Sequence, residues 1–497
     1  MSVAALGLDP TSLLATAVFV LSLIWWLSTR PPPGLPPGPG PALPFLGHLH
    51  LVKQDPRPQF RQWRRQYGDV FSMYIGSQLV VILNGYKVIK EALIKQADVF
   101  SDRPQVPLFS HVNLGEGLLS GSGPLWKATR TTSLNILRQF GMGKNLLAQK
   151  LQEEINEYLK VIASKKGQPF DILRLTQNSV SNNICSIIFG KRFEYDDPVF
   201  QEYLQALEVV LGTLSPTCVP LLFPSVRFIP GDPFHARKAI SCIRTVMDKF
   251  IGPSIETHRR AYEEGSEDDF INAYIRQMKL HKSGLLATNE EKEFPRTITD
   301  LFAAGTETTT TSIRWTIVYF LHHPDVQEKC YQEVLKVVGT GRQPDIRDKP
   351  EMTYLQATIM EVLRIANVVP LSVLHATSGD VTFSGYHIPE GSYVVVNLDS
   401  VLHDREVWGD PDEFRPERFI GPDGKLIKRD EFIPFSTGRR VCLGEALAKM
   451  ELLLYLANMI QRFRFLPPED GRLPSLKSIL GSASYPKPFD VRFVPRE

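Results

Sequence analysis

Apolar residues recur at intervals of three and four along most of the chain beyond residue 50, which is the spacing of one helix face. Helices are predicted over Phe60–Tyr67, Tyr86–Lys95, Trp126–Phe140, Lys144–Ala163, Ile172–Phe189, Val199–Leu211, His235–Arg260, Phe294–Leu321, Val326–Val338, Met352–Ile365 and Glu445–Phe463. Short runs rich in β-branched and aromatic residues predict strands at Val70–Ile75, Leu79–Leu83, Val381–Phe383, Tyr393–Val396 and Phe489–Val494. The fold class is therefore mainly α with small β-sheets, and it lacks the regular strand–helix alternation of a TIM barrel or doubly wound sheet.

The N-terminal residues follow a different pattern. Ser12–Ser28 is uncharged and dominated by large apolar residues, and its length is near the lower limit for a membrane-spanning helix. Trp25 and Trp26 suit a membrane interface. The first basic residue, Arg30, follows the apolar run, which disfavours a cleaved signal peptide and leaves the rest of the chain in the cytosol. We therefore expect residues 1–29 to form an N-terminal transmembrane anchor.

A proline-rich segment, residues 30–49, comes next. Its prolines exclude helix and central strand, so we expect a stiff, extended spacer. No Ser/Gly linker, charge block or repeat divides residues 50–497, which favours one large domain.

Composition and charge narrow the class of protein. A hydrophobic content of 43% and a charged content of 22% are those of an ordinary globular protein. The net charge is +2 and no basic stripe is present, so no nucleic-acid partner is expected. The five cysteines are scattered without a CxxC pair, which argues against a disulfide framework or a zinc site and fits a reducing compartment.

One cysteine has a distinctive setting. Residues 435–444 read Phe-Ser-Thr-Gly-Arg-Arg-Val-Cys-Leu-Gly and precede a run of strong helix formers, which places Cys442 at a helix N-terminus. Free backbone N–H groups and the positive end of the helix dipole favour a thiolate there. The alternative is that Cys442 is one more buried small hydrophobic residue. Neighbours that suit a cysteine ligating the metal of a planar cofactor are Phe435, Gly438, Arg440 and Gly444.

The pattern Phe-x-x-Gly-x-Arg-x-Cys-x-Gly resembles the haem-binding loop of the cytochrome P450 family. The resemblance implies the cytochrome P450 fold, in which haem b lies between a long distal helix and the proximal cysteine loop, with Cys442 as the iron ligand. Residues 50–497 would then form a haem-thiolate monooxygenase domain. Further motifs of the family occur in family order along nearly the whole chain.

Basic and aromatic residues are expected to hold the haem propionates. Trp126 and Arg130 are four apart on one helix face, a spacing that by itself is more often surface stacking. Their flanking sequence resembles that of microsomal family members, in which such a pair binds the propionates. The same resemblance adds Arg103, His375 and Arg440, because buried carboxylates need cations and donors. Without the resemblance, His375 reads as a satisfied core histidine.

The segment 303–311 is unusual for a helix interior, because it combines Gly305 with a run of threonines. Its apolar flanks argue for burial and against an exposed threonine-rich face. Ala304 leaves room for a flat ring, Thr308 offers a hydroxyl, and Glu307 is an acid that can take protons from solvent. In the family, the matching acid–alcohol pair delivers protons to bound oxygen, so we expect Glu307 and Thr308 to be catalytic.

A structural network is predicted around Glu361 and Arg364, which are three apart on one helix face. Alone, this is a common surface ion pair of little energetic value. It matches the family's ExxR motif, and Arg418 follows in Pro-Glu-Arg-Phe. By resemblance, the three residues form a buried network that retains the cofactor and takes no part in the chemistry.

The substrate pocket is expected, by resemblance, to be mostly apolar and to take a lipophilic substrate. Besides Ala304 and Thr308, its predicted lining is Phe109, Val112, Leu114, Leu211, Phe302, Leu371, Val373, Ser482 and Ala483. Leu374 stands where the relatives often have proline, a departure that bears on the pocket wall. The apolar loop 219–230 is expected to dip into the bilayer, with core packing between helices as the alternative.

In detail the resemblance is to microsomal family 2 members, which oxidise drugs, steroids and fatty acids. It implies an enzyme of the endoplasmic reticulum membrane, with its catalytic domain on the cytosolic side. The expected reaction inserts one atom of O₂ into a lipophilic xenobiotic, steroid or fatty acid. Two alternatives remain: an oxygen-independent haem-thiolate isomerase or dehydratase, in which the acid–alcohol pair is often altered, and a non-enzymatic haem- or ligand-binding membrane protein.

Electrons must come from another protein, because no Rossmann or flavin fingerprint is present. By resemblance, the donor is an NADPH-dependent flavin reductase, with cytochrome b5 as a further partner. Lys127, Arg138 and Arg439 are candidates for a basic docking surface, and the alternative is an ordinary solvated face.

Overall fold

The computed structural model describes residues 9–28, 33–43, 45–104, 116–140, 145–212, 223–263, 265, 268–280 and 290–496. Its longer helices are α1 (Pro10–Ser28), α2 (Arg57–Tyr67), α7 (Gly123–Gln139), α8 (Asn145–Ser164), α9 (Leu173–Ile188), α10 (Pro198–Gly212), α12 (Ala236–Val246), α13 (Gly252–Ala261), α14 (Phe270–Leu280), α16 (Glu290–His322), α17 (Pro324–Val338), α18 (Thr353–Ala366) and α21 (Glu445–Arg462). Short helices are α3 (Tyr86–Lys90), α4 (Ala97–Phe100), α6 (Gly117–Ser120), α19 (Asp399–Leu402) and α20 (Arg405–Trp408). The strands are β1 (Val70–Ile75), β2 (Gln78–Leu83), β3 (Phe170–Asp171), β4 (His375–Ala376), β5 (Val381–Phe383), β6 (Tyr386–Ile388), β7 (Tyr393–Val396), β8 (Phe463–Leu466), β9 (Ser478–Leu480), β10 (Ser484–Pro486) and β11 (Asp490–Pro495).

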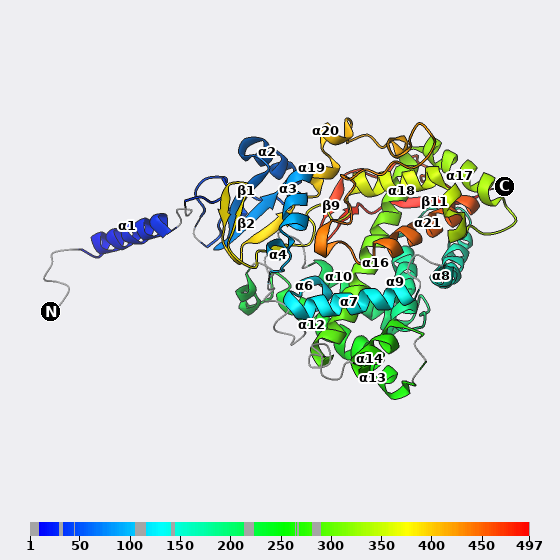
Figure 1. Ribbon diagram of the computed structural model, residues 1–497, viewed down its shortest axis with the longest axis horizontal. Coiled ribbons are helices and arrows are strands. Elements are labelled where there is room, and N and C mark those ends of the chain that lie inside the picture. Colours follow the sequence, from blue (N-terminus) through cyan, green and yellow to red (C-terminus); the bar gives the residue numbers. More distant parts are fainter. Residues whose placement is uncertain are drawn as a thin grey trace.

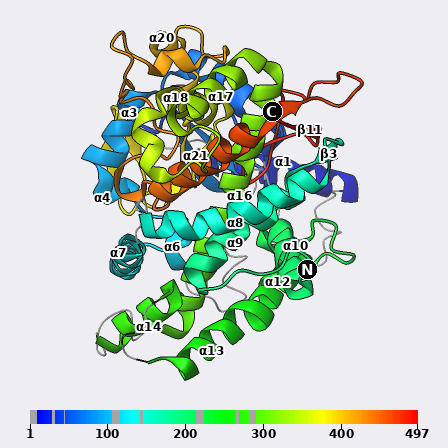
Figure 2. The same ribbon diagram turned by 90° about the vertical axis from the view of Figure 1, so that its right-hand side faces the viewer.

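Helix α16 is the central element of the fold and runs through the middle of the helical body in both views (Figures 1 and 2). It packs against α6, α9, α18 and α21. Residues 309–321 of α16 are buried without interruption, although positions 309–312 are all threonine or serine. Because buried hydroxyls must find partners, this helix is a place where polar contacts gather inside the protein.

The largest sheet has the strand order β1-β2-β7-β4 and lies at the end of the molecule nearer α1 (Figure 1). Strands β1 and β2 form an antiparallel hairpin whose turn contains Gly76 at φ 61°, a left-handed conformation that glycine adopts without strain. Strand β7 pairs parallel to β2 and antiparallel to β4. In the β4–β7 pair, His375 of β4 lies opposite Val394 of β7. The sheet thereby fixes the backbone position of His375.

The helices predicted from periodicity are present, with ends shifted by a few residues. Two predicted helices, Tyr86–Lys95 and His235–Arg260, contain a π-helical turn, at Glu91–Lys95 and Met247–Ile251. Helix α14 and strands β3, β4, β6, β8, β9 and β10 were not predicted. Most of those strands have only two or three residues, which is too short for an alternating pattern to be visible.

Helix α1 forms from the apolar N-terminal run and projects away from the rest of the protein (Figure 1). Of the residues that the structure describes, none belong to a helix with the length and apolar character needed to cross a bilayer. The transmembrane part of the fold prediction is therefore not confirmed, and residues 1–8 and 29 of the predicted anchor lie outside the described residues.

Candidate functional site

A cavity of about 290 Å³ lies between the middle of α16 and the loop that precedes α21. Ala304 of α16 and Cys442 of the loop are both exposed to it, although the helix around Ala304 is otherwise well covered. The wall is mostly apolar and takes isoleucine side chains from α9 and leucine side chains from α6. Ala304, predicted for the distal side of the site, and Cys442, predicted for the proximal side, thus line the same cavity.

The loop before α21 holds Cys442 at the helix start. The N–H of Cys442 donates to the carbonyl of Phe435 at 3.0 Å, which closes the loop. Burial raises the pKa of the Cys442 thiol, while the N–H groups of Gly444 and Glu445 and the cation of Arg130 lower it. A metal cation on the sulfur would act in the same direction as these donors and hold it as a thiolate.

The other described cysteines behave as small hydrophobic residues. Cys185 and Cys330 are buried, and desolvation raises the pKa of both thiols. Cys242 is partly buried in α12. None of these three lines the cavity. The interpretation as a buried small hydrophobic residue therefore fits these cysteines and does not fit Cys442.

The predicted glycines serve different purposes. Gly444 lines the cavity, where an added Cβ would meet nothing within 4 Å. Gly438, at φ +77°, does not line it, and an added Cβ would lie 2.1 Å from the carbonyl oxygen of Leu93. Glycine at 438 therefore lets the loop pack against the backbone at Leu93, a different reason from the predicted one.

Three arginines and a histidine gather at the cavity. Arg103, Arg130 and Arg440 line it, and His375 lies within reach of the charges on Arg103 and Arg440. Desolvation and, after it, repulsion from the neighbouring arginines lower the pKa of Arg103 and of His375. The same two causes lower the pKa of Arg440 to about 9. Arg103 Nε, His375 Nε2 and Arg440 Nη1 are buried without a partner in the described part of the chain. An anion with several acceptor oxygens is the group that these residues lack.

Backbone carbonyls orient the cationic side chains. Arg103 Nη1 donates to the carbonyls of Val373 and Leu374 at 2.7 and 2.8 Å. His375 Nδ1 donates to the carbonyl of Phe100 at 2.7 Å, which leaves Nε2 free. Leu374, the departure from the relatives' proline, thus contributes its carbonyl to the position of Arg103.

Trp126 is not on the cavity wall and supports the cations from behind. Its Nε1 donates to the carbonyl of Leu118 at 3.2 Å, which fixes the ring. Both Arg130 and Arg440 lie over that ring in cation–π geometry. The i,i+4 spacing of Trp126 and Arg130 therefore produces the stacking that the sequence suggests, directly beside the cavity.

Thr308 and Glu307 face different surroundings. Thr308 lines the cavity, and its hydroxyl donates to the carbonyl of Ala304 at 2.8 Å. Glu307 is not part of the wall, and its carboxyl lies beside the Tyr485 side chain and near Arg314. Burial raises the pKa of Glu307, while Tyr485 and Arg314 lower it. The alcohol therefore meets the cavity, and the acid lies on another face of α16.

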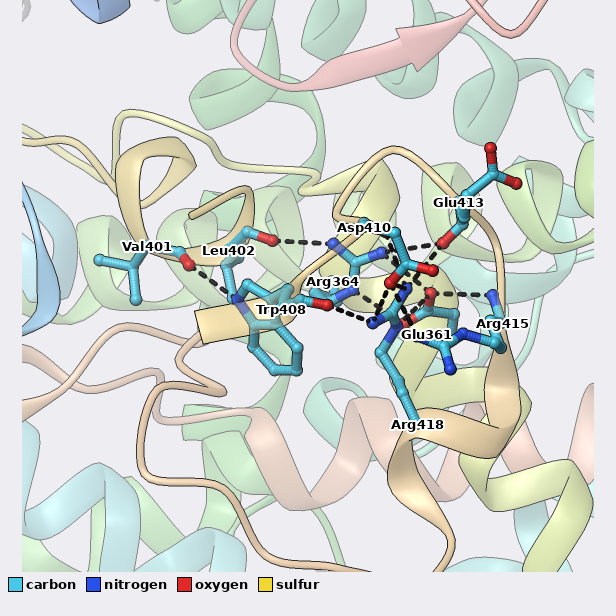
Figure 3. A network of polar contacts seen from close by, with 9 residues as sticks. All are labelled: Glu361, Arg364, Val401, Leu402, Trp408, Asp410, Glu413, Arg415 and Arg418. Atoms are coloured by element: carbon cyan, nitrogen blue, oxygen red, sulfur yellow. Dashed lines mark hydrogen bonds and ion pairs between the residues drawn. The ribbon is translucent and has the colours of Figure 1, made fainter. Parts of the chain in front are cut away.

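Glu361, Arg364 and Arg418 form a buried network (Figure 3). One oxygen of Glu361 is 2.8 Å from Arg364 Nε and the other is 2.8 Å from Arg418 Nε. Arg364 also donates to the carbonyl of Leu402 at 2.8 Å, and Arg418 to that of Trp408 at 2.9 Å. Because one carboxylate serves two guanidinium groups, its buried charge is fully compensated.

The predicted pocket residues separate in the structure. Val373 lines the cavity, whereas Phe302 packs edge-to-face on Tyr203, with ring centroids 4.5 Å apart. Phe302 precedes Ala304 by two positions, which turns it about 200° around the helix, away from the cavity. Those absent from the cavity wall are Leu211, Phe302, Leu371, Ser482 and Ala483. Those outside the described residues are Phe109, Val112 and Leu114.

Sequence reasoning missed two acids of α16 that hold the backbone of segment 116–119. The two carboxylate oxygens of Glu293 accept hydrogen bonds from the N–H groups of Glu116 and Gly117, at 3.0 Å each. Asp300 Oδ2 accepts hydrogen bonds from the N–H groups of Leu118 and Leu119, at 2.9 Å each. Asp300 also lines the cavity and pairs with Arg296 at 2.9 Å. The i,i+4 spacing of that pair was the available signal.

A third acid was also missed. Glu451 of α21 is 1% exposed and lines the cavity. The signal was a single acid within the apolar run 450–456. Such an acid is expected to be buried with its helix.

These features suit one kind of cofactor. A cysteine at a helix start, an open space facing its sulfur, and a cationic wall with unused donors fit a planar metal complex that carries carboxylates. The fold and the site therefore define a haem-thiolate protein.

Comparison with known proteins agrees. The cytochrome P450 family model matches residues 36–493. Human cytochrome P450 2U1 is 38% identical over 98% of this chain and 94% of its own length, and human cytochrome P450 2J2 is 37% identical over 98% and 96%. Rabbit cytochrome P450 2J1 is 36% identical over 99% and 97%. The chain belongs to the cytochrome P450 family, as a haem-dependent monooxygenase similar to its family 2 members. This confirms the predicted family, reaction class and cofactor.

Proposed function

We propose that this monooxygenase oxidises a lipophilic organic substrate of the xenobiotic, steroid or fatty-acid class. The observation that carries the proposal is the apolar wall of the cavity, contributed by Leu118, Leu119, Ile184, Val369 and Val373. A wall of this kind favours a substrate that leaves water for apolar contacts.

The side chains around the cavity divide the work. When bound, the haem supplies oxygen activation, and a thiolate ligand favours that chemistry. Cys442 would hold the iron, while Arg103, Arg130, His375 and Arg440 would hold the propionates, with Trp126 supporting Arg130 and Arg440 from behind. Thr308 presents its hydroxyl to the cavity and passes a proton inward.

Glu307 supplies that proton from the other face of α16. Its carboxyl lies beside the Tyr485 side chain, so it must turn away from Tyr485 to reach Thr308. The acid and alcohol therefore act in sequence, with the acid exchanging protons on the outer side.

The electron donor is an NADPH-dependent flavin reductase, with cytochrome b5 as a second partner. Lys127, Arg138 and Arg439 are exposed and suit an acidic docking face. Alanine at these positions should raise the reductase Michaelis constant. An unchanged constant would leave them as an ordinary solvated face.

The enzyme associates with the endoplasmic reticulum membrane from its cytosolic side. The support is exposed apolar surface on α1 and at Phe228 and Ile229, which are 73% and 40% exposed. Residues 219–222 of the predicted membrane loop lie outside the described residues. Flotation of the purified protein with neutral lipid vesicles tests the association, and slower hydrogen–deuterium exchange at residues 223–229 in the presence of vesicles tests the loop separately from α1. Unchanged exchange there would exclude this loop.

Reconstitution tests the reaction. Purified protein is combined with reductase, NADPH and a panel of lipids, steroids, drugs and polar compounds under labelled O₂. Label in a product of a lipophilic substrate supports the proposal, and label only in products of polar substrates would overturn the substrate class. A Cys442→Ser variant that keeps the wild-type thiolate band in its CO-difference spectrum would overturn the ligand assignment.

A further inference from the structure

Helix α9 carries a row of buried polar side chains that the function above does not use. These are Thr176, Gln177, Asn178, Ser179, Ser181, Asn182 and Asn183. Buried polar groups are costly unless they are paired, so their partners are informative. Several of the partners come from α16 and α21, and one of them reaches the cavity.

Glu451 of α21 is that residue. Its Oε1 accepts a hydrogen bond from Asn183 Nδ2 at 3.0 Å, and its Oε2 is hydrogen-bonded to the Thr309 hydroxyl at 3.2 Å. Asn183 Nδ2 also donates to the Tyr455 hydroxyl at 3.0 Å, and Tyr455 is 2.6 Å from Ser179 Oγ. Glu451 and Thr309 both line the cavity, so this polar seam has an inner end there.

The seam also has an outer end. Ser179 lies beside Glu154 and Tyr195, close enough to lower the pKa of both side chains, and the Tyr195 hydroxyl donates to Glu154. Glu154 pairs with Arg192 at 3.1 Å, and the side chain of Arg192 is 33% exposed. A series of polar groups therefore leads from the protein surface to the cavity, on a side of α16 that does not include Glu307.

The surroundings of Glu451 favour its protonated form at neutral pH. The side chains facing it are Asn183 from α9, Thr309 from α16 and Tyr455 from its own helix, and none of these is a cation. Within the described residues, no cation is among the groups that shift the pKa of Glu451. Burial raises the pKa of Glu451 to about 8, which the two hydrogen bonds only partly oppose.

We propose that Glu451 is a second proton donor to the cavity, acting through the Thr309 hydroxyl and independently of Glu307. The inference rests on the proposed function, since it needs a reaction that consumes protons. The carboxyl gives its proton to Thr309 Oγ, and the hydroxyl releases its own proton into the cavity. One proton enters, and Glu451 is left as a carboxylate.

The Glu451 carboxylate is reprotonated from the outer end of the polar seam. The Asn183 amide does not carry the proton, because its nitrogen donates to both neighbours and holds them within reach of each other. Tyr455 follows Glu451 by four positions on the same helix face. When the Asn183 side chain moves aside, the Tyr455 hydroxyl reaches the carboxylate, donates its proton and takes another from Ser179, which is reprotonated from solvent past Glu154.

Infrared spectroscopy of the folded protein tests the charge state without turnover. The wild type should show a protonated-carboxyl band at neutral pH that fades as the pH rises through about 8, and Glu451→Gln should lack it. Absence of the band from the wild type at neutral pH would overturn the proposal.

The coupling of NADPH consumption to product formation tests whether Glu451 acts as a proton donor. The fraction of consumed NADPH that yields product should fall as pH rises through about 8 in the wild type. In Glu451→Gln it should be lower by about threefold or more and independent of pH in this range. Thr309→Val should show the same loss while it keeps the infrared band.

The matched control is Thr306→Val, which removes a buried hydroxyl that pairs with Ser181 of α9 at 3.2 Å and leaves Glu451 and the cavity untouched. It should keep wild-type coupling. If Thr309→Val matches Thr306→Val while the wild type forms labelled product, the proton-donor role fails and the proposed function stands. Absence of labelled product from every lipophilic substrate in the wild type marks failure of the proposed function itself. Should Glu451→Gln fail to fold, the two threonine variants and the wild-type band carry the test.

Discussion

The guanidinium carbon of Arg440 lies 3.4 Å from the centroid of the Trp126 ring. Arg440 Nε donates to the carbonyl of Ser101 at 2.7 Å, and Nη1 is left without a partner in the described chain. The aromatic face thus supports one side of the cation, and the free nitrogen is available to an anion. A desolvated stack of this kind contributes about 2 kcal/mol, enough to matter for how firmly a cofactor is held.

Arg440→Lys should therefore weaken haem retention. Lysine keeps the charge but loses the planar fork and the stack on Trp126. We expect the haem dissociation rate, measured by transfer to a haem-scavenging protein, to rise about tenfold, which corresponds to about 1.4 kcal/mol. Arg439→Lys is the control, because Arg439 is 52% exposed and pairs with Asp98. Equal rates in the two variants would show that the stack contributes nothing.

Glu361→Gln should destabilise the fold strongly. The change leaves Arg364 and Arg418 without their shared counter-charge at a site where no side chain of the three is more than 3% exposed. Breaking a buried pair in this way costs about 3–5 kcal/mol. The midpoint of urea unfolding should fall accordingly.

A surface pair provides the comparison for that prediction. Glu417 lies 3.0 Å from Lys329, and both side chains are about half exposed. Glu417→Gln should cost less than about 1 kcal/mol, since exposed pairs contribute little. A Glu361→Gln protein as stable as Glu417→Gln would contradict the account of the network.

Asp300 and Glu293 should protect different amides of segment 116–119. Asp300→Asn weakens the bonds to the N–H groups of Leu118 and Leu119, and Glu293→Gln weakens those to Glu116 and Gly117. Hydrogen bonds to charged groups contribute about 1.5–3 kcal/mol, so exchange at the affected amides should accelerate about 10- to 100-fold. Each variant is the control for the other in hydrogen–deuterium exchange. Uniform acceleration across the segment would show a general loosening instead.

Local patterns predicted the parts of the site that are local in sequence. Cys442 and its loop lie within ten residues, and Glu361 and Arg364 lie within one helical turn. Their geometry follows from helix periodicity and backbone chemistry, which the sequence displays directly. The helix ends were predicted to within a few residues for the same reason.

Facing directions within a helix were harder to predict. Helix α16 is buried on several sides, so hydrophobicity did not separate Phe302, which faces the core, from Ala304, which faces the cavity. Asp300 and Glu451 were missed because their partners lie on α6 and α9, more than a hundred residues away along the chain. No spacing rule links residues over such distances, and only the folded chain brings them together.

Glu451 should make the protein less stable as the pH rises. Its pKa is about 8 in the folded protein and 4.5 in the unfolded chain, so the unfolded state releases the proton first. Below pH 4.5 both states are protonated and the acid has no such effect. Between pH 4.5 and about 8 the free energy of unfolding falls, by an amount on the order of a few kcal/mol, and above that range the loss is constant.

Glu451→Gln removes this dependence, because glutamine keeps the hydrogen-bonding shape without a titrating proton. Unfolding midpoints in urea should be nearly equal for the two proteins at the acidic end, and the variant should become progressively more stable than the wild type towards pH 8. The acidic measurement is an internal control for packing changes, which would shift the two curves by the same amount at every pH. A constant offset between the curves would mean that Glu451 is ionised in the folded protein throughout this range, and both this prediction and the proton-donor role would then be wrong.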